Sequence, residues 1–325
     1  MSAAFDARTA VKNLLRKTPF YGVAKDLYRR RVRAAGLFDV ALLDITNGCN
    51  LRCPFCYNDW SAVGEPALMP VERFDRVVQV FGLVRNDGVA ISCSFEPFLH
   101  PQFPELLARI PARYRSKGYF STNLARPLRG GVAEALAAAP LHHINVSMES
   151  LTAATYEACR KGASFPRFHA NLEALARAVA GSRRGPALHV ITMLCDLNLR
   201  EIPELVRRCR EELGVAYHEV RPFTRTPANE AWIAAHGVTE EQWRWLRDAL
   251  DSSGATHCNL LPLPRDEGST HYMELPDTRF LRVEADGRLA LGQNPRMEPE
   301  LETHLDEIDD LESFLKRWIR RHRTA

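Results

Sequence analysis

The sequence predicts an α/β protein whose parallel strands form a sheet that is either open or curved into a partial barrel. Between about residues 40 and 250, six short apolar segments alternate with longer segments of helical period. The apolar segments contain few polar residues, as expected for strands that are covered on both faces. Because a strand followed by a helix usually leads to a parallel strand, six such units in series predict a parallel sheet. A chain of 325 residues with 46% hydrophobic side chains can bury the core that this fold needs.

The individual elements follow from these apolar runs and from turn signals. The expected strands cover residues 40–46, 89–94, 118–122, 143–148, 188–194 and 217–222. The expected helices cover residues 71–84, 103–116, 132–139, 168–179, 202–212 and 240–250. After Asp251 two apolar runs, 280–284 and 288–291, flank Asp286-Gly287, which is a strong hairpin signal, and a final helix is expected at 311–321. We therefore expect a basic helical arm at 1–37, a barrel at 38–250 and a small cap at 251–325.

The net charge of +3 is the sum of three unlike segments. Residues 1–35 contain nine Lys or Arg and two acids, and residues 316–325 contain five basic residues and no acid. The 280 residues between them carry 29 basic and 38 acidic side chains, a net charge of −9. The basic arm predicts a solvated face packed under the barrel, a docking surface for an acidic electron donor or, as the least favoured reading, a membrane or nucleic-acid contact. Because no aromatic-rich nucleic-acid module accompanies the charge, we expect no nucleic-acid partner.

The composition also indicates a compartment. No apolar run reaches the roughly 18 residues needed to span a bilayer, and no secretory apolar region is visible near residue 1. Eight Cys in a chain of this length are not a small disulfide scaffold, and three of them fall within eight positions. This grouping predicts metal ligation in a reducing cytoplasm, without a transmembrane segment.

Cys49, Cys53 and Cys56 follow directly on the first expected strand. Three thiolates on one loop suit a cubane iron–sulfur cluster, whose usual four Cys ligands would be one short here. The next Cys in the chain is Cys93, at the end of the second expected strand. A cluster held by three sulfurs leaves one iron free to bind substrate, whereas a structural zinc site normally closes its fourth position. The alternative is a zinc site in which a distant His supplies the fourth ligand.

The Cys-x3-Cys-x2-Cys spacing, with Phe55 before the third Cys, resembles the signature of the radical S-adenosylmethionine (SAM) enzymes. The resemblance covers about residues 38–250 and implies a TIM-like partial (β/α)6 barrel that is followed by a small α+β cap. It implies a single [4Fe-4S] cluster held by Cys49, Cys53 and Cys56, with SAM bound to the open iron. In barrels of this kind the functional loops follow the C-terminal ends of the strands, which is where Cys49 stands.

The resemblance further implies contacts to SAM at the ends of the later strands. The segment 94–97 is similar to the family's Gly-Gly-Glu-Pro turn, which binds the SAM ammonium, although both glycines are replaced. The pair Thr122-Asn123 resembles a Thr-Asn-Gly turn, and Ser147 and Glu149 share the strand face that would meet the ribose and carboxylate. The residues expected to contact SAM are Phe55, Ser94, Glu96, Thr122, Asn123, Ser147, Glu149, Asn198 and Arg221.

The chemistry that the resemblance implies is reductive cleavage of SAM to a 5′-deoxyadenosyl radical, which abstracts hydrogen from an unactivated C–H bond. The cofactor carries this chemistry while the protein supplies orientation and a dry pocket. A flavodoxin- or ferredoxin-type protein is the expected electron donor. On position alone, Cys195 at the end of the fifth strand is predicted to donate hydrogen to a substrate radical; ordinary packing of a buried thiol is the alternative.

The C-terminal region resembles a degenerate SPASM or twitch subdomain. Gly292 stands where a Cys would follow the hairpin, and after Cys209 only Cys258 remains, so we expect no auxiliary cluster. With an arm too short for a peptide-leader domain, this favours a small-molecule substrate, such as a sugar, aminocyclitol or natural-product intermediate, that undergoes epimerisation, dehydration or a redox change. The alternatives are a peptide presented by a separate recognition protein, or a non-catalytic iron–sulfur or zinc protein.

Overall fold

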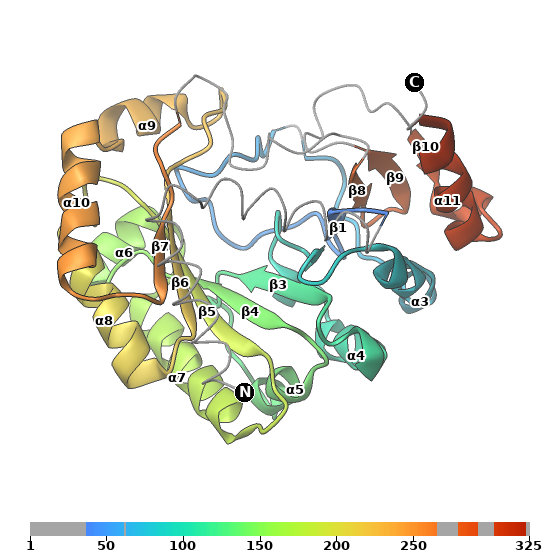
Figure 1. Ribbon diagram of the computed structural model, residues 1–325, viewed down its shortest axis with the longest axis horizontal. Helices are drawn as coiled ribbons and strands as arrows, with labels where there is room; N and C mark the ends of the chain where they lie inside the picture. Colours follow the sequence, from blue (N-terminus) through green and yellow to red (C-terminus); the bar gives the residue numbers. More distant parts are fainter. Residues whose placement is uncertain (1–36, 62, 265–278, 292–301, 323–325) are drawn as a thin grey trace, which may run out of the picture.

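The computed structural model describes residues 37–61, 63–264, 279–291 and 302–322. Within these ranges the strands form one ten-stranded sheet in the order β10-β9-β8-β1-β2-β3-β4-β5-β6-β7. From β8 across to β7 neighbouring strands are parallel, and β9 and β10 are antiparallel. The two edge strands do not pair with each other, so the sheet curves without closing (Figure 1). The predicted α/β fold with a partial barrel of parallel strands is confirmed.

The six predicted strands are all present; four end earlier than predicted, the third has the predicted bounds and the fifth is shifted by one residue. They are β1 (Val40–Leu43), β2 (Val89–Ile91), β3 (Gly118–Thr122), β4 (His143–Ser147), β5 (Ala187–Met193) and β6 (Tyr217–Arg221). Each pairs in parallel with the next in chain order, so their C-terminal ends share one edge of the sheet. This edge collects the loops on which the sequence places its chemistry.

The residues after 251 extend this sheet at both sides. β7 (Cys258–Leu260) pairs in parallel with β6, and β8 (Phe280–Val283) pairs in parallel with β1. The predicted hairpin is β8 with β9 (Arg288–Leu291), and Gly287 in its turn has a φ of 100°, which favours glycine. β10 (Glu302–His304) adds to β9. The segment predicted as a cap therefore shares backbone hydrogen bonds with the barrel.

Helices cover the outer face of the sheet (Figure 1). They are α3 (Val71–Val78), α4 (Phe103–Ala108), α5 (Val132–Ala138), α6 (Ala153–Cys159), α7 (Phe165–Gly181), α8 (Ile202–Leu213), α9 (Glu230–His236), α10 (Glu240–Ser252) and α11 (Leu311–His322), with the 3-10 turns η1 (Gln79–Leu83), η2 (Pro97–Leu99), η3 (Ala112–Tyr114) and η5 (Leu305–Glu307). The helix predicted at 103–116 is interrupted, because Pro111 lacks an N–H and restricts the residue before it. The helix predicted at 71–84 starts as α3 and ends as η1.

The two faces of the sheet differ in polarity. On β4, Ile144 and Val146 point outward and belong to the same buried apolar core as Phe168 of α7. Burial of side chains of this size stabilises the fold by roughly 1.5–3 kcal/mol each. Asn145 and Ser147 alternate with them and point into the barrel, because successive strand residues face opposite sides. The helices thus hold the sheet together from outside, and the inner face carries polar groups.

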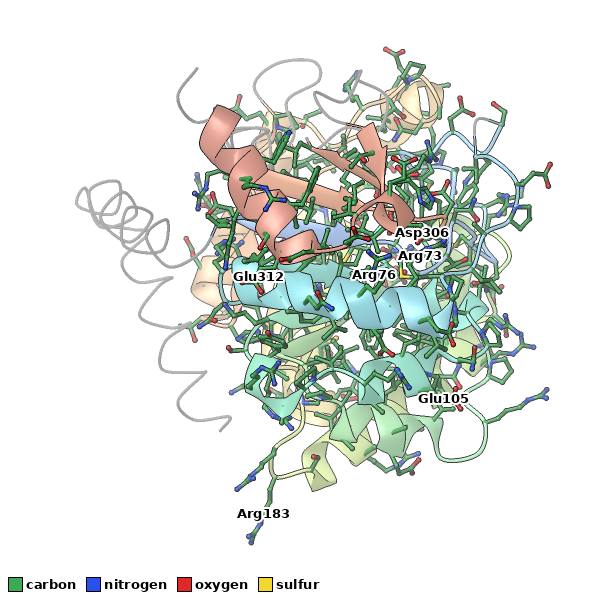
Figure 2. All side chains as sticks on the ribbon, turned by 90° about the vertical axis from the view of Figure 1, so that its right-hand side faces the viewer. Arg73, Arg76, Glu105, Arg183, Asp306 and Glu312 are labelled. Carbon is green, nitrogen blue, oxygen red and sulfur yellow. The ribbon has the colours of Figure 1, made fainter. Side chains whose placement is uncertain are left out.

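The C-terminal region contacts α3 through hydrogen bonds and apolar packing. Arg73 donates a hydrogen bond of 2.7 Å to the carboxylate of Asp306, and Arg76 donates to the carbonyl of Ile308; Figure 2 shows Arg73 and Arg76 beside Asp306. Three apolar residues of α11 join the main core, Leu311, Leu315 and Trp318. The basic arm predicted at 1–37 lies, apart from residue 37, outside the described residues.

Candidate active site

The loop after β1 carries Cys49, Cys53 and Cys56, whose thiols are free and partly buried. It is held to two neighbouring loops by backbone bonds. The N–H of Glu96 donates to the carbonyl of Gly48 (2.9 Å), and the N–H of Arg52 donates to a carbonyl in the loop after α6 (3.0 Å). A Cβ at position 48 would lie 2.9 Å from the Cδ1 of Leu99 in the neighbouring turn, so a larger residue there would make this side chain shift. The three thiols therefore stand on a fixed loop.

Polar groups surround the three sulfurs. The N–H of Leu51 and the side-chain amide of Asn123 approach the Sγ of Cys49 at 3.5 and 3.6 Å, and the guanidinium of Arg160 approaches the Sγ of Cys53 at 3.8 Å. Burial raises the pKa of Cys53 to about 11, and Arg160 opposes this rise. Hydrogen bonds to sulfur stabilise thiolate ligands and set the potential of an iron–sulfur cluster, so these donors fit such a group.

In the part of the chain that the structure describes, the metal-ligand atoms that lie within 4.8 Å of one another belong to Asp87, His142 and His143 and not to the three cysteines.

Arg160, which sequence reasoning missed, supplies the main positive charge beside the cysteines. It follows α6, its side chain is 11% exposed, and it donates through two nitrogens to both carboxylate oxygens of Glu149, whose side chain is fully buried. Its guanidinium also lies 5.2 Å from the centre of the Phe55 ring. A single Arg at the end of a helix carries no pattern that marks it in the sequence, so only the fold reveals this pair.

Glu96 joins the turn after β2 to the end of β3. Its carboxylate accepts hydrogen bonds from the Thr122 hydroxyl (2.8 Å) and from the N–H groups of Asn123 (2.7 Å) and Phe98 (3.2 Å). Burial raises the pKa of Glu96 to about 7, against the effect of these donors. The backbone carbonyl of Ser94, on the same turn, accepts a hydrogen bond from the side-chain amide of Asn58 (2.8 Å). The structure thus brings Glu96, Thr122 and Asn123 together beside Cys49.

Three further residues predicted to contact SAM lie at the ends of later strands. Ser147 lies half-buried on the inner face of β4. Asn198 is buried, donates to the carbonyls of Glu149 and Met193 (both 2.9 Å), and accepts from the N–H of Cys195 (3.0 Å). Arg221 donates to the carboxylate of Glu219 on the same strand. Asn198 therefore connects the ends of β4 and β5, and Arg221 faces the interior.

Phe55 and Cys195 meet in a small apolar cluster behind the cysteine loop. The Phe55 ring lies 5.2 Å from that of Phe223 and 5.5 Å from that of Trp232. Cys195 is fully buried there, with its Sγ 3.9 Å from the Sγ of Cys159. The prediction that Cys195 donates hydrogen to a substrate radical stays a prediction.

The inner face of the sheet carries polar groups and pairs of opposite charge. On one side Glu219 is contacted by Tyr217 (3.1 Å), Arg221 and Asn259 (3.4 Å). On the other side the guanidinium of Arg282 on β8 lies 3.8 Å from a carboxylate oxygen of Asp44. Hydroxyl, amide and paired charged groups therefore face the inside of the barrel.

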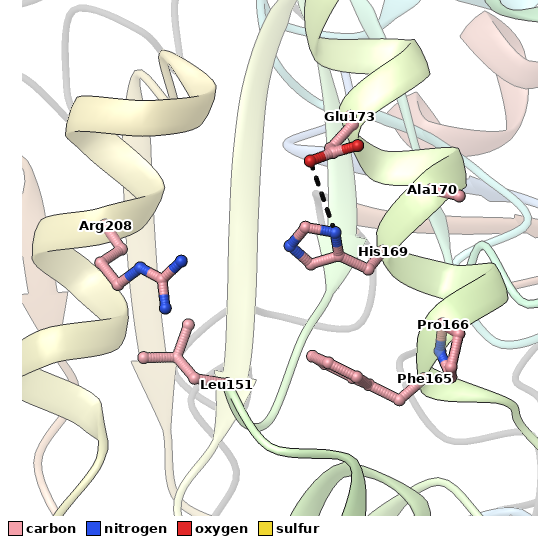
Figure 3. A pocket seen from close by; sticks show the side chains of 7 residues that line it. All are labelled: Leu151, Phe165, Pro166, His169, Ala170, Glu173 and Arg208. Atoms are coloured by element: carbon pink, nitrogen blue, oxygen red, sulfur yellow. Dashed lines mark ion pairs between the residues drawn. The ribbon is translucent and has the colours of Figure 1, made fainter.

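A shallow pocket of about 360 Å³ lies elsewhere, between α7 and α8 on the outer layer. Figure 3 shows His169 and Glu173 of α7 on one side and Arg208 of α8 on the other. None of its lining residues belongs to the cysteine loop or to the inner face of the sheet. It is therefore separate from the candidate active site.

The sequence pattern of the Radical SAM superfamily matches residues 43–209, which begin at the end of β1 and end in α8. The chain belongs to the radical SAM superfamily. The match contains the cysteine loop, Glu96, Glu149 and Asn198. This radical SAM chain is accordingly an enzyme, and enzymes of this family use a [4Fe-4S] cluster and SAM. No helix among the described residues combines the length and apolar character needed to cross a bilayer.

Curated relatives include the GTP 3′,8-cyclase of Chlorobaculum tepidum, which is 27% identical over 268 residues and covers 77% of this chain and 77% of that protein. The GTP 3′,8-cyclase of Marinobacter nauticus is 23% identical, covering 73% and 68%. Among solved structures, Streptococcus suis SuiB bound to S-adenosylmethionine superposes with a TM-score of 0.63 at 16% identity, covering 87% of this chain and 66% of that one. The AdoMet-bound anSMEcpe structure has a TM-score of 0.58 at 13% identity, covering 85% and 80%. These structures share the fold of this radical SAM enzyme.

Proposed function

We propose that Cys49, Cys53 and Cys56 hold the [4Fe-4S] cluster of this enzyme and that SAM binds beside it, in the mouth of the barrel. The observation that carries this proposal is the position of three free, partly buried thiols on one fixed loop at the C-terminal edge of the sheet. When bound, the cluster and SAM supply a 5′-deoxyadenosyl radical that abstracts hydrogen from the substrate. The protein's own residues then have to orient SAM and exclude water.

The surroundings of several predicted SAM contacts support a role for them. Glu96, ionised above pH 7, offers a buried carboxylate to the SAM ammonium, and Thr122 and Asn123 fix its orientation. Ser147 lies on the inner face of β4 and Glu149 follows the end of that strand, so both stand where the ribose and carboxylate groups of SAM are proposed to bind. Arg160 holds the Glu149 carboxylate in place. Phe55, Ser94, Asn198 and Arg221 complete the proposed set.

We propose a small polar molecule as the substrate, of the sugar, aminocyclitol or natural-product class. The relatives are named for a reaction of GTP, which is also a small molecule. A triphosphate, however, calls for unpaired cationic side chains. Arg221 and Arg282 on the inner face each have a carboxylate beside them, Glu219 and Asp44. Among the described residues, this pairing favours a polar substrate without negative charge over a nucleoside triphosphate.

Anaerobic reconstitution tests the assignment. We expect about four irons per chain, and 5′-deoxyadenosine and methionine when SAM and dithionite are added. Added sugars and aminocyclitols should raise the rate of SAM cleavage more than GTP does, if the proposed substrate class is right. A stable zinc site without SAM cleavage would sink the assignment of the cysteines, and stimulation by GTP alone would overturn the substrate class.

The electron donor is proposed to be an acidic flavodoxin- or ferredoxin-type protein that docks on the basic arm at 1–35. The support is charge alone, nine basic residues against two acids, because the arm lies outside the described residues. Reduction of the cluster by such a donor should slow as salt increases, and deletion of residues 1–35 should remove this dependence. Equal salt dependence in the truncated protein would exclude the arm as the docking surface.

A further inference from the structure

Three metal-ligand side chains converge at the opposite edge of the sheet, at the N-terminal ends of β2 and β4. The Oδ1 of Asp87 lies 3.2 Å from the Nδ1 of His143 and 3.5 Å from the Nδ1 of His142. The two Nδ1 atoms are 2.9 Å apart. In the part of the chain that the structure describes, this is the trio of ligand atoms that lies within 4.8 Å of one another.

These separations fit the ligands of one divalent transition ion. Zinc binds imidazole nitrogen and carboxylate oxygen at about 2.0–2.2 Å, so adjacent ligand atoms around such an ion are roughly 3.0–3.4 Å apart. The triangle formed by Asp87, His142 and His143 has edges of 2.9, 3.2 and 3.5 Å. Two imidazoles that turn the same nitrogen toward each other need either a proton or a cation between them, and the Asp87 carboxylate beside both would stabilise either one.

The three side chains are held before any ion binds. The N–H of Asp87 donates to the carbonyl of Ser116, and the N–H of His142 donates to the carbonyl of Gly118, both at 2.7 Å. These two carbonyls flank the start of β3, so the loop before β2 and the start of β4 are tied to the strand between them. Asp87 itself has a φ of 57°, a left-handed conformation that Asp and Asn adopt more readily than other side chains.

The ring of His143 is fixed by stacking. It lies between Tyr119 of β3, at 4.5 Å between ring centres, and His189 of β5, at 4.1 Å, and both pairs are nearly parallel. Its side chain is 7% exposed, whereas those of His142 and Asp87 are 29% and 48% exposed. An ion could therefore reach the trio from solvent and keep water in its open positions, while His143 holds it from inside.

We propose that Asp87, His142 and His143 form a binding site for a divalent transition ion such as Zn²⁺, separate from the cysteine loop. Nitrogen and oxygen ligands distinguish this site from the three thiols, which suit an iron–sulfur cluster. The site lies at the edge of the sheet where barrel proteins keep groups that serve stability, and it joins two loops across β3. Its ion stabilises the folded chain, because an ion bound only by the folded state shifts the unfolding equilibrium.

The test measures zinc on the cluster-loaded enzyme by equilibrium dialysis, after treatment with a chelator that leaves the iron in place. We expect about one zinc per chain in addition to the iron, and a higher melting temperature with zinc than without it. Asp87→Asn keeps a residue that tolerates the left-handed conformation, and His142→Ala removes one ligand at the surface. Each should weaken zinc binding by at least about tenfold and leave the iron content and SAM cleavage unchanged.

The matched control is His169→Ala on α7, which removes an exposed His that faces Glu173 at 3.6 Å in an ordinary surface pair. This variant should bind zinc as the unchanged enzyme does. Zinc binding that is equal in Asp87→Asn, His142→Ala and the unchanged enzyme overturns the proposal. The proposal is also overturned if the unchanged enzyme binds no zinc when the zinc concentration is about ten times that of the protein. Because iron and SAM cleavage are measured in the same samples, failure of this site is distinguishable from failure of the cysteine assignment.

Discussion

The same parallel strands end in two chemically different edges. At the C-terminal edge the loop from β1 to α3 covers residues 44–70 and brings thiols, Glu96 and the Glu149–Arg160 pair together. At the N-terminal edge the connections are short, such as residues 182–186 between α7 and β5, and the inner face carries stacked rings. The connection from β4 to α6 at the C-terminal edge is equally short, residues 148–152, yet it carries Glu149. The side chains that the connections carry, rather than their length alone, therefore distinguish the two edges.

Both edges keep buried charges in pairs, and the N-terminal edge also buries a neutral ring. At the C-terminal edge Arg160 pairs with Glu149 beside Cys53. At the N-terminal edge Arg279 pairs with Asp39, which precedes β1. His189 is buried there between rings, and burial holds its pKa well below its ordinary value, so it stays neutral. A neutral stacked ring needs no counter-charge, but a buried ion does, so we expect loss of one member of a buried ion pair to cost more stability than replacement of His189.

The largest effect should follow loss of a proposed cluster ligand. Cys53→Ala should reduce the iron content far below about four per chain and lower SAM cleavage by more than about 10³-fold, because two thiolates cannot hold a cubane. Iron analysis and 5′-deoxyadenosine yield measure this. Cys209→Ala, which removes a buried thiol of α8 far from the loop in sequence, is the control and should keep its iron. Normal SAM cleavage by Cys53→Ala would contradict the assignment of the C-terminal edge.

The next effect concerns the buried ion pair. Arg160→Met leaves the fully buried carboxylate of Glu149 without its partner and should lower the free energy of unfolding by about 3–5 kcal/mol. Anaerobic urea unfolding measures the change. Replacing both residues, Arg160→Met with Glu149→Leu, should recover most of the loss, because an apolar pair needs no compensation. Arg207→Met, in an exposed pair on α8, should change little. An equal loss in both single variants would show that burial is not the cause.

A pH-dependent effect is expected at Glu96. Burial raises its pKa from 4.5 to about 7, so the folded state binds this proton more tightly than the unfolded state. The resulting stability is complete below pH 4.5 and is lost as the pH rises through 7, by up to about 3 kcal/mol. Glu96→Gln cannot titrate, so the SAM-free variant should lose less stability between pH 5 and 8 than the unchanged enzyme. Parallel stability curves for the two proteins would refute this.

The smallest effect is expected away from both edges. Asp306→Ala removes the exposed partner of Arg73 where the C-terminal region meets α3. Ion pairs in solvent contribute little, so the melting temperature should fall by no more than about 1–3 °C, with SAM cleavage unchanged. Thermal unfolding at low and high salt measures this change in melting temperature. A larger fall would mean that the contact of the C-terminal region with α3 depends on this ion pair.

Sequence patterns anticipated the parts of this enzyme that depend on local order. The six strands, the Asp286-Gly287 hairpin and the three cysteines lie where periodicity and spacing predicted them. The break at Pro111 was missed, although the residue itself signals it. Arg160 and the trio at Asp87 could not be found in this way, because their partners are 11 and about 55 residues away in the chain. No local pattern encodes such contacts.

The sequence by itself determined the α/β class, the order of the strands and the radical SAM signature, because strand and helix periods and motif spacing act over a few residues. The tertiary structure alone decided that β8 pairs with β1, that Arg160 lies beside Cys53, and that Asp87 meets His142 and His143. These contacts arise only when curvature of the sheet and packing of the helices bring distant segments together. Chemistry at both edges depends on that curvature and packing.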